Sequence, residues 1–226
     1  PALTRAIEAL ARAEAATPFM VLLAGFQAVL GRWAGLDDLV VGTPIAGRTP
    51  ETEEMIGPFV DMLAMRAVID PRQGFRALLA QMRRRTLGAF AHQDVPFERL
   101  IEELRPARIS GRPPLFQVTF VLQPPAVEPP RLDGLAIEGL AVDPARADFD
   151  LSLDLSMVDG RIAGWLDFAA ALFDPDTMAG LVTGLRALLD AAVRAPDLPL
   201  RDLPWLDQTT AAEMADGWTG GPPPPA

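Results

Sequence analysis

Residues 151–168 read LSLDLSMVDGRIAGWLDF, and this stretch is the clearest single indication of the class of fold. Leucine and methionine alternate with serine and aspartate over its first half, which is the period of two that a half-buried β-strand shows. Asp159-Gly160 then supplies a two-residue turn of the kind that hairpins favour, and a second run returns to Phe168. The stretch therefore predicts two adjacent antiparallel strands.

Helical patterns lie on both sides of this hairpin. Apolar residues recur at helical spacing in the stretches 3–15, 19–33, 72–91, 96–104 and 175–194. The second stretch is apolar nearly all round and follows Thr17-Pro18, an N-cap residue with proline at the first helical position. We therefore expect a buried helix there.

Three further strands complete the expected sheet. Residues 39–42 form a short apolar run closed by Gly42-Thr43-Pro44, and residues 115–122 form another. Residues 59–69 are apolar on both faces apart from two charged side chains, so this strand is predicted to be central. Helices mixed with adjacent antiparallel strands predict an α+β fold, a mixed or antiparallel sheet covered by helices.

The composition excludes several classes of protein. The chain has 226 residues, half of them hydrophobic, and a net charge of −10, so nucleic acid and anionic membranes are poor partners. With no cysteine and one histidine, His92, a disulfide framework, a thiolate nucleophile and a structural zinc site are excluded, and no metal site is predicted. We find no basic leader and no apolar run long enough to span a bilayer, so a cytoplasmic location is expected.

Four motifs resemble those of the condensation domains of nonribosomal peptide synthetases, in the family's order. Residues 92–98 read HQDVPFE, which matches a family motif of that sequence. Residues 56–66, IGPFVDMLAMR, resemble IGxFVNTLPLR, and residues 108–117, which end in PLFQ, resemble RDxSRxPLFQ. Residues 41–48, VGTPIAGR, resemble the turn that precedes these motifs in the family.

The resemblance extends over nearly all of residues 3–210. It implies that residues 1–200 form the C-terminal lobe of a condensation domain, in which each of two lobes is similar to chloramphenicol acetyltransferase. Residues 201–226 resemble the linker toward an adenylation domain. The Pro- and Gly-rich residues 123–147, with a short strand expected near 135–142, would cross over to the N-terminal lobe.

The resemblance also implies a reaction. In the whole domain, an amine on the acceptor phosphopantetheine arm attacks the thioester on the donor arm and forms a peptide bond. The arms are substrates, and no directly bound cofactor is expected. The implied partners are the N-terminal lobe, peptidyl carrier proteins and an adjacent adenylation domain. The family's HHxxxDG motif, which holds the catalytic histidine, is absent from these 226 residues, so we assign no catalytic residue and expect an isolated lobe to be inactive.

Three motif residues are candidates for the contact between lobes or for the substrate tunnel. Arg48 follows a sharp Gly-Thr-Pro turn and could reach a carboxylate of the N-terminal lobe; the alternative is a solvated surface arginine. Asp61 stands where the family usually has asparagine, and an ionised aspartate only accepts hydrogen bonds. This departure either alters the site or reflects degeneration. Gln117 ends the PLFQ motif and is a candidate for the tunnel wall.

The polar face of the hairpin, Ser152, Asp154 and Ser156, either lines the tunnel or faces solvent as an ordinary sheet surface. Other motif residues are expected to be structural. The ring of His92 is expected to hold a turn between two helices by hydrogen bonds. Asp94-Val95-Pro96 stops one helix and starts the next, and Asp150 belongs to the FDL landmark.

Two other functions stay open at this point. One is a non-catalytic relative that recruits carrier proteins or tailoring enzymes, in which case the upstream sequence would lack an intact HHxxxDG. The other is an epimerisation or ester-forming relative; the PLFQ ending favours a condensation type over epimerisation.

Overall fold

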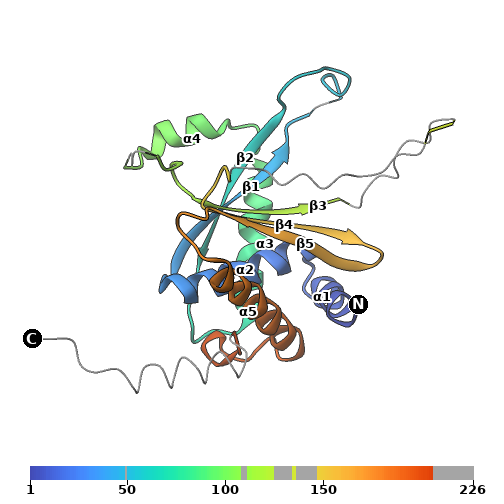
Figure 1. Ribbon diagram of the computed structural model, residues 1–226, viewed down its shortest axis with the longest axis vertical. Helices are drawn as coiled ribbons and strands as arrows, with labels where there is room; N and C mark the ends of the chain where they lie inside the picture. Colours follow the sequence, from blue (N-terminus) through green and yellow to red (C-terminus); the bar gives the residue numbers. More distant parts are fainter. Residues whose placement is uncertain (49, 108–110, 125–133, 136–146, 206–226) are drawn as a thin grey trace, which may run out of the picture. The chain divides into compact units, whose positions relative to one another are not determined.

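The computed structural model describes residues 1–48, 50–107, 111–124, 134–135 and 147–205 (Figure 1). The chain divides into two compact units, which we treat separately. The sheet unit comprises residues 1–5, 40–66 and 83–174, and the helix unit comprises residues 6–39, 67–82 and 175–226.

Five strands form one mixed sheet, in the order β2-β1-β3-β4-β5. Their bounds are Asp38–Ala46 (β1), Val60–Val68 (β2), Val118–Gln123 (β3), Leu151–Val158 (β4) and Arg161–Phe168 (β5). β1 pairs with β3 and β3 with β4 in parallel, whereas β4 and β5 are antiparallel (Figure 1). The predicted hairpin is therefore confirmed, with its turn at Asp159-Gly160, and so is the α+β class with a mixed sheet.

Two predictions about the first strands are wrong. The stretch predicted to be central is β2, which is an edge strand of the described sheet. One face of β2 is buried at Leu63, Met65 and Ala67, but on the other face Val60 is 72% exposed. The prediction failed because a strand with apolar residues on both faces need not be buried on both. β1 also continues through Gly42-Thr43-Pro44 to Ala46, because the fixed φ of proline is compatible with an extended backbone.

The outer strand β5 is bonded at its edge by Thr4, in the first turn of the first helix, α1 (Ala2–Ala13). The backbone N–H of Ile162 donates to the hydroxyl of Thr4 at 3.2 Å, and Thr4 is buried. Pairing of this kind satisfies a group that an exposed edge strand would offer to another chain.

The helix unit is built on the packing of α2 (Pro18–Ala34) against α5 (Pro175–Arg194) (Figure 1). The predicted cap is confirmed: Met20 N–H donates to the Thr17 hydroxyl at 3.3 Å, and Pro18 opens the helix. Phe26 and Leu188 lie in the core with no exposed surface. A side chain at Gly25 would meet Leu189, so this glycine permits the close approach of the two helices.

Two further helices carry the motif residues 92–98. They are α3 (Phe75–Ala91), which begins three residues later than expected, and α4 (Phe97–Leu104), which directly follows Pro96. In the part of the chain that the structure describes, no single helix is long and apolar enough to cross a membrane, and α1 and α2 meet that criterion only as a bent pair.

Candidate functional site

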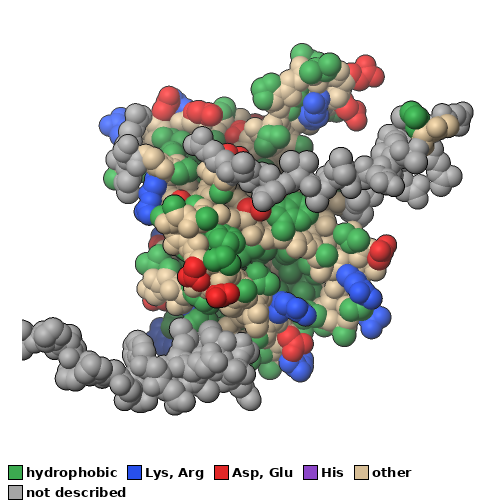
Figure 2. All heavy atoms as spheres, viewed as in Figure 1, with side chains coloured by type: hydrophobic (Ala, Val, Ile, Leu, Met, Phe, Trp, Pro, Cys, Tyr) green, Lys and Arg blue, Asp and Glu red, His purple; other side chains and the backbone are tan. Residues whose placement is uncertain are grey.

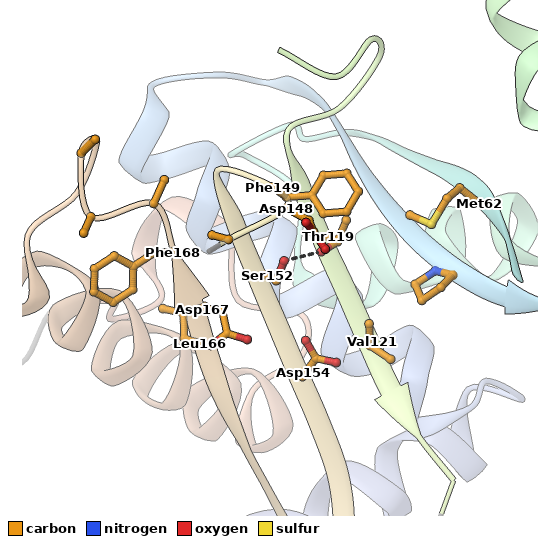
Figure 3. A pocket seen from close by; sticks show the side chains of 15 residues that line it. Met62, Thr119, Val121, Asp148, Phe149, Ser152, Asp154, Leu166, Asp167 and Phe168 are labelled. Carbon is orange, nitrogen blue, oxygen red and sulfur yellow. Dashed lines mark hydrogen bonds between the residues drawn. The ribbon is translucent and has the colours of Figure 1, made fainter. Parts of the chain in front are cut away.

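A cavity of about 860 Å³ lies in the sheet unit, over one face of β3, β4 and β5 (Figure 3). The strand register explains which side chains line it. Thr119 pairs with Ser152, and Ser152 pairs in turn with Asp167, so these three form one row across the sheet. Val121 and Asp154 form the next row. Alternate residues of the same strands, such as Phe120 and Leu153, are buried on the opposite face.

Polar groups of this face interact directly. The Thr119 hydroxyl donates to the Ser152 hydroxyl at 2.8 Å (Figure 3). Burial raises the pKa of Asp154, the neighbouring Asp167 carboxylate raises it further, and a hydrogen bond with the Gln123 side chain opposes both effects. No basic side chain is among the described residues that line the cavity. The polar side chains of this otherwise largely apolar lining are therefore carboxylates and hydroxyls.

An aromatic stack supports one wall of the cavity. Phe149 lines the cavity, and its ring lies 6.0 Å from that of Phe116. Phe116 is 2% exposed and lies 5.3 Å from Phe97, the first residue of α4. On β1, a Cβ added to Gly42 would lie 2.1 Å from the Phe116 ring, so only glycine leaves room for it.

This stack explains why separate motifs belong to one site. Phe97 comes from HQDVPFE, Phe116 from PLFQ, Phe149 from the FDL landmark and Gly42 from VGTPIAGR. The three phenylalanines form the stack and Gly42 leaves room for it, so these motif residues contribute packing beside the cavity rather than reactive groups.

Of the six residues predicted for the inter-lobe contact or the tunnel, Ser152 and Asp154 line the cavity, and Ser156 does not. Gln117 does not line it: the Gln117 side-chain amide donates to the carbonyl of Pro113 at 2.8 Å. Asp61 does not line it either, although its neighbour Met62 does. The Asp61 carboxylate accepts from the Met62 backbone N–H at 2.7 Å, a local contact that asparagine could also make.

Arg48 organises the loop between β1 and β2. One guanidinium nitrogen, Nη1, donates to the carbonyls of Thr52, Glu53 and Met55 at 2.8–3.0 Å. The guanidinium also stacks over the Phe59 ring, 4.6 Å from its centroid. The loop stands out from the sheet at the top of Figures 1 and 2, and Ile56 within it is fully exposed.

The expected structural residues lie at turns. His92 Nδ1 is 2.8 Å from the carbonyl of Gly88, which joins the ring to the last turns of α3. Asp94 is exposed between α3 and α4, and Pro96 precedes the first residue of α4. Asp150 acts through its backbone: its N–H donates to the carbonyl of Gln117, and its carbonyl accepts from the N–H of Ala169.

The cavity residues that escaped prediction from the sequence include Thr119, Asp148, Phe149 and Asp167. The position of Asp167 could have been predicted from the sequence. The Asp159-Gly160 turn fixes the register of the hairpin, and this register places Asp167 directly opposite Ser152. The position of Thr119 could not have been predicted, since its place beside Ser152 depends on parallel pairing between strands that are far apart in the sequence. Among the described residues, no three or more His, Asp or Glu side chains are grouped to hold a metal ion.

The raised pKa of Asp154 gives the first testable prediction. A carboxyl whose pKa is higher in the folded state stabilises the fold while protonated, and this stability is lost as the pH rises through the raised pKa. Asp154→Asn should therefore be more stable than the parent at pH 7, by less than about 1 kcal/mol because the group is partly solvated. The gain should shrink below the ordinary aspartate pKa of about 3.9.

Urea unfolding at pH 7 and at pH 3.5 measures this difference. Asp94→Asn, at an exposed position of the same unit, is the matched control. An equal gain in both variants would show that burial in the cavity wall is not its cause.

Comparison with solved structures first shows the fold of the chain. The chain superposes on a four-domain nonribosomal peptide synthetase, holo-AB3403, with a TM-score of 0.79 at 24% identity, covering 92% of this chain and 17% of that one. It superposes on the X-domain solved in complex with OxyB from teicoplanin biosynthesis with a TM-score of 0.80 at 27% identity, covering 91% of this chain and 46% of that one.

The family follows from the sequence comparison. A model of the condensation domain matches residues 1–215, so the chain belongs to the condensation-domain family. It is 39% identical over 220 residues to a linear gramicidin synthase of Brevibacillus parabrevis, covering 96% of this chain and 3% of that protein. It is 41% identical to phosphinothricin tripeptide synthetase PhsC of Streptomyces viridochromogenes, covering 90% and 19%. The resemblance inferred from the motifs is confirmed, and the chain spans only a small part of these relatives.

Proposed function

We propose that this chain forms the C-terminal lobe of a peptide-bond-forming condensation domain, residues 1–200, and that its cavity is one wall of the substrate tunnel. The observation that carries the proposal is the row Thr119–Ser152–Asp167, which faces a cavity lined also by Phe149, whose ring stacks on Phe116 of the PLFQ motif. The chain covers about half of a solved X-domain chain, 46%, which agrees with one lobe of two.

The reaction assigned to this site joins two carrier-bound substrates. The amine on the acceptor phosphopantetheine arm attacks the thioester carbonyl on the donor arm, the new amide forms, and the donor thiol leaves with a proton. Most of the rate enhancement comes from holding both arms in one tunnel, which brings the amine close to the thioester. The group that transfers the proton is supplied by an N-terminal lobe that bears HHxxxDG. The acidic lining suits an approaching amine better than a carboxylate.

The proposed partners follow from this arrangement. They are the N-terminal lobe, two peptidyl carrier proteins, and an adenylation domain reached through residues 201–226. The loop that Arg48 orders is the proposed contact with the N-terminal lobe, because it presents Met55 and Ile56 to solvent, 55% and 104% exposed, and apolar residues exposed together mark interaction surfaces. Asp61 and Gln117, which lie outside the cavity lining, are proposed to contribute to the contact between lobes or to the tunnel beyond this cavity. The phosphopantetheine arms are the proposed substrates, and the lobe itself is proposed to bind no cofactor.

A substitution that fills the cavity tests the function. In the whole synthetase, Ser152→Trp should lower amide formation between carrier-bound aminoacyl groups by about 100-fold or more, because displacement of a reacting group by 1 Å already costs that much. Thr183→Trp, on an exposed position of α5, is the control and should keep the parent rate. Product amide is measured by mass spectrometry, with carrier loading and the melting temperature measured in parallel.

Normal amide formation by a folded, fully loaded Ser152→Trp protein would overturn the assignment of the cavity to the tunnel. No amide from the parent itself would favour a second candidate, a non-catalytic recruiting domain. The match to an X-domain that was solved in complex with OxyB is the observation that favours this alternative.

A further inference from the structure

The strand β2 has an outer edge, because β1 is its one neighbour in the sheet that the structure describes. Two backbone bonds at the ends of β2 show which of its peptide groups face β1. Ile69 N–H donates to the carbonyl of Asp37 at 2.7 Å, and Gly47 N–H donates to that of Phe59 at 2.6 Å. Peptide groups along an antiparallel strand point alternately to its two sides, so odd-numbered residues are bonded toward β1. The residues whose N–H and C=O groups point to the outer edge are Val60, Met62, Ala64, Arg66 and Val68.

Gln81 of α3 occupies this edge at Val68 as a further strand would. Val68 N–H donates to Gln81 Oε1 at 2.9 Å, and Gln81 Nε2 donates to the Val68 carbonyl at 2.9 Å. Two residues that exchange both bonds form the hydrogen-bonded pair of an antiparallel ladder, and a side-chain amide carries a donor and an acceptor as a peptide group does. One side chain therefore takes both bonds that a neighbouring strand would make at this residue.

Arg85 occupies the next outward position of the edge. Its Nη1 donates to the carbonyl of Arg66 at 2.6 Å. Gln81 and Arg85 are four residues apart on one face of α3, a rise of about 6 Å, and the residues that they bind are two apart on β2, about 6.7 Å. The helix therefore presents side chains at the repeat of the strand. The match ends after Arg85, because Gly88 and Ala89 carry no hydrogen-bonding side chain.

Without these contacts, β2 would offer an edge on which a second copy of itself pairs. Its sequence, VDMLAMRAV, is largely apolar, and Val60 and Val68 at its ends are 72% and 40% exposed. Antiparallel pairing of two copies about Ala64 would set outward residues opposite each other, Val60 opposite Val68 and Met62 opposite Arg66. An unpaired apolar edge strand is a template for association of this kind.

We propose that Gln81 and Arg85 guard the outer edge of β2 against pairing with a second copy of this chain. The pairing would be symmetric about Ala64. A bond already made at Val68 or Arg66 therefore blocks that residue in one chain and the residue opposite it in the other. With both guards in place in both chains, only the pairing of Ala64 with its own copy is left.

The proposal goes beyond the condensation reaction, because it concerns how the chain avoids associating with itself. The carboxylate of Asp61 acts in the same sense at the other end of the strand, where it accepts from the outward N–H of Met62 at 2.7 Å and adds a charge. The guards would be needed in a catalytic or a recruiting domain alike, so their test is independent of amide formation.

The oligomeric state of the full chain tests the proposal. Gln81→Leu combined with Arg85→Leu removes the side-chain bonds at Val68 and Arg66, and this variant should form a dimer, measured as a doubled mass by sedimentation or light scattering. The matched control is Arg84→Leu combined with Gln93→Leu, which makes the same change of composition at two exposed positions on and just after α3. The control should keep the mass of the parent at every concentration.

Hydrogen exchange locates the contact between the copies. In the test variant, exchange at Ala64, whose N–H points to the outer edge, should slow by about tenfold or more as the dimer forms. In the control it should not depend on protein concentration. Adding Ala64→Lys to the test variant should restore the mass of the parent, because two lysines would face each other at the centre of the pairing.

A test variant that keeps the mass of the parent, or a control that associates as strongly, would overturn the proposal. A dimer without slower exchange at Ala64, or one that persists with Ala64→Lys, would also overturn it, since its contact would lie elsewhere on the surface. If the double variant does not fold, Gln81→Met decides. Methionine is close to glutamine in length and cannot make either bond with Val68, so this variant should associate more strongly than the parent, and an unchanged mass would count against the guard.

Discussion

Gly42→Ala should lower the stability of the chain by about 2 kcal/mol or more, because its methyl group would overlap a buried ring. The added Cβ would lie 2.1 Å from Phe116, which is 2% exposed and stacked between Phe97 and Phe149. Since neighbours hold the ring on both sides, the strand or the stack must shift. A loss of that size corresponds to a fall in melting temperature of roughly 4–8 °C for a chain of this length.

The matched control is Gly88→Ala. Gly88 lies within α3 and a Cβ there meets no atom within 4 Å, so alanine should raise stability by about 0.5–1 kcal/mol through its better helix propensity. Thermal unfolding followed by circular dichroism measures both changes. Combining Gly42→Ala with Phe116→Leu should restore part of the loss, and a double variant less stable than Gly42→Ala alone would contradict the overlap as its cause.

The second large effect is expected in the core of the helix unit. Phe26 of α2 has no exposed surface, so Phe26→Ala removes a ring from a packed interior and should cost about 3–5 kcal/mol. Phe90→Ala is the control: this ring is 41% exposed on α3, and its loss should cost less than about 1 kcal/mol.

Urea denaturation of the two variants checks this difference in free energy of unfolding. Similar losses at Phe26 and Phe90 would mean that burial does not distinguish the two positions. A large loss at Phe26 would show that the apolar run 19–33, which the sequence alone identified as a buried helix, forms the stabilising core of its unit.

Local patterns predicted the elements well where short-range chemistry determines them. The Thr17-Pro18 cap, the Asp159-Gly160 turn and the alternation along residues 151–157 all act within a few residues, and each is present as expected. The position of a strand within the sheet is set by its long-range partners instead. This is why β2 was placed centrally, although it lies at the edge.

The site residues also divide into those that a local pattern predicts and those that long-range packing brings to the cavity. Ser152 and Asp154 were predicted because the hairpin repeat puts them on one polar face, and both line the cavity. Thr119 and Phe149 could not be predicted in this way, since parallel pairing and an aromatic stack bring them there from other parts of the chain. The motifs identified the family, but only the packing shows that Gly42 and Phe116 act together.

The parallel pairing of β3 with β4 has a consequence for the order in which the sheet assembles. β4 and β5 are joined by a two-residue turn, and hairpins of this kind form in about 1–10 μs. β3 reaches β4 only after the chain closes a loop of about 27 residues, with an entropy cost that grows with loop length. We therefore expect the hairpin to form first and to serve as the template on which β3 docks. Ser152 and Asp167 should then meet early in folding, and Thr119 should complete the row late.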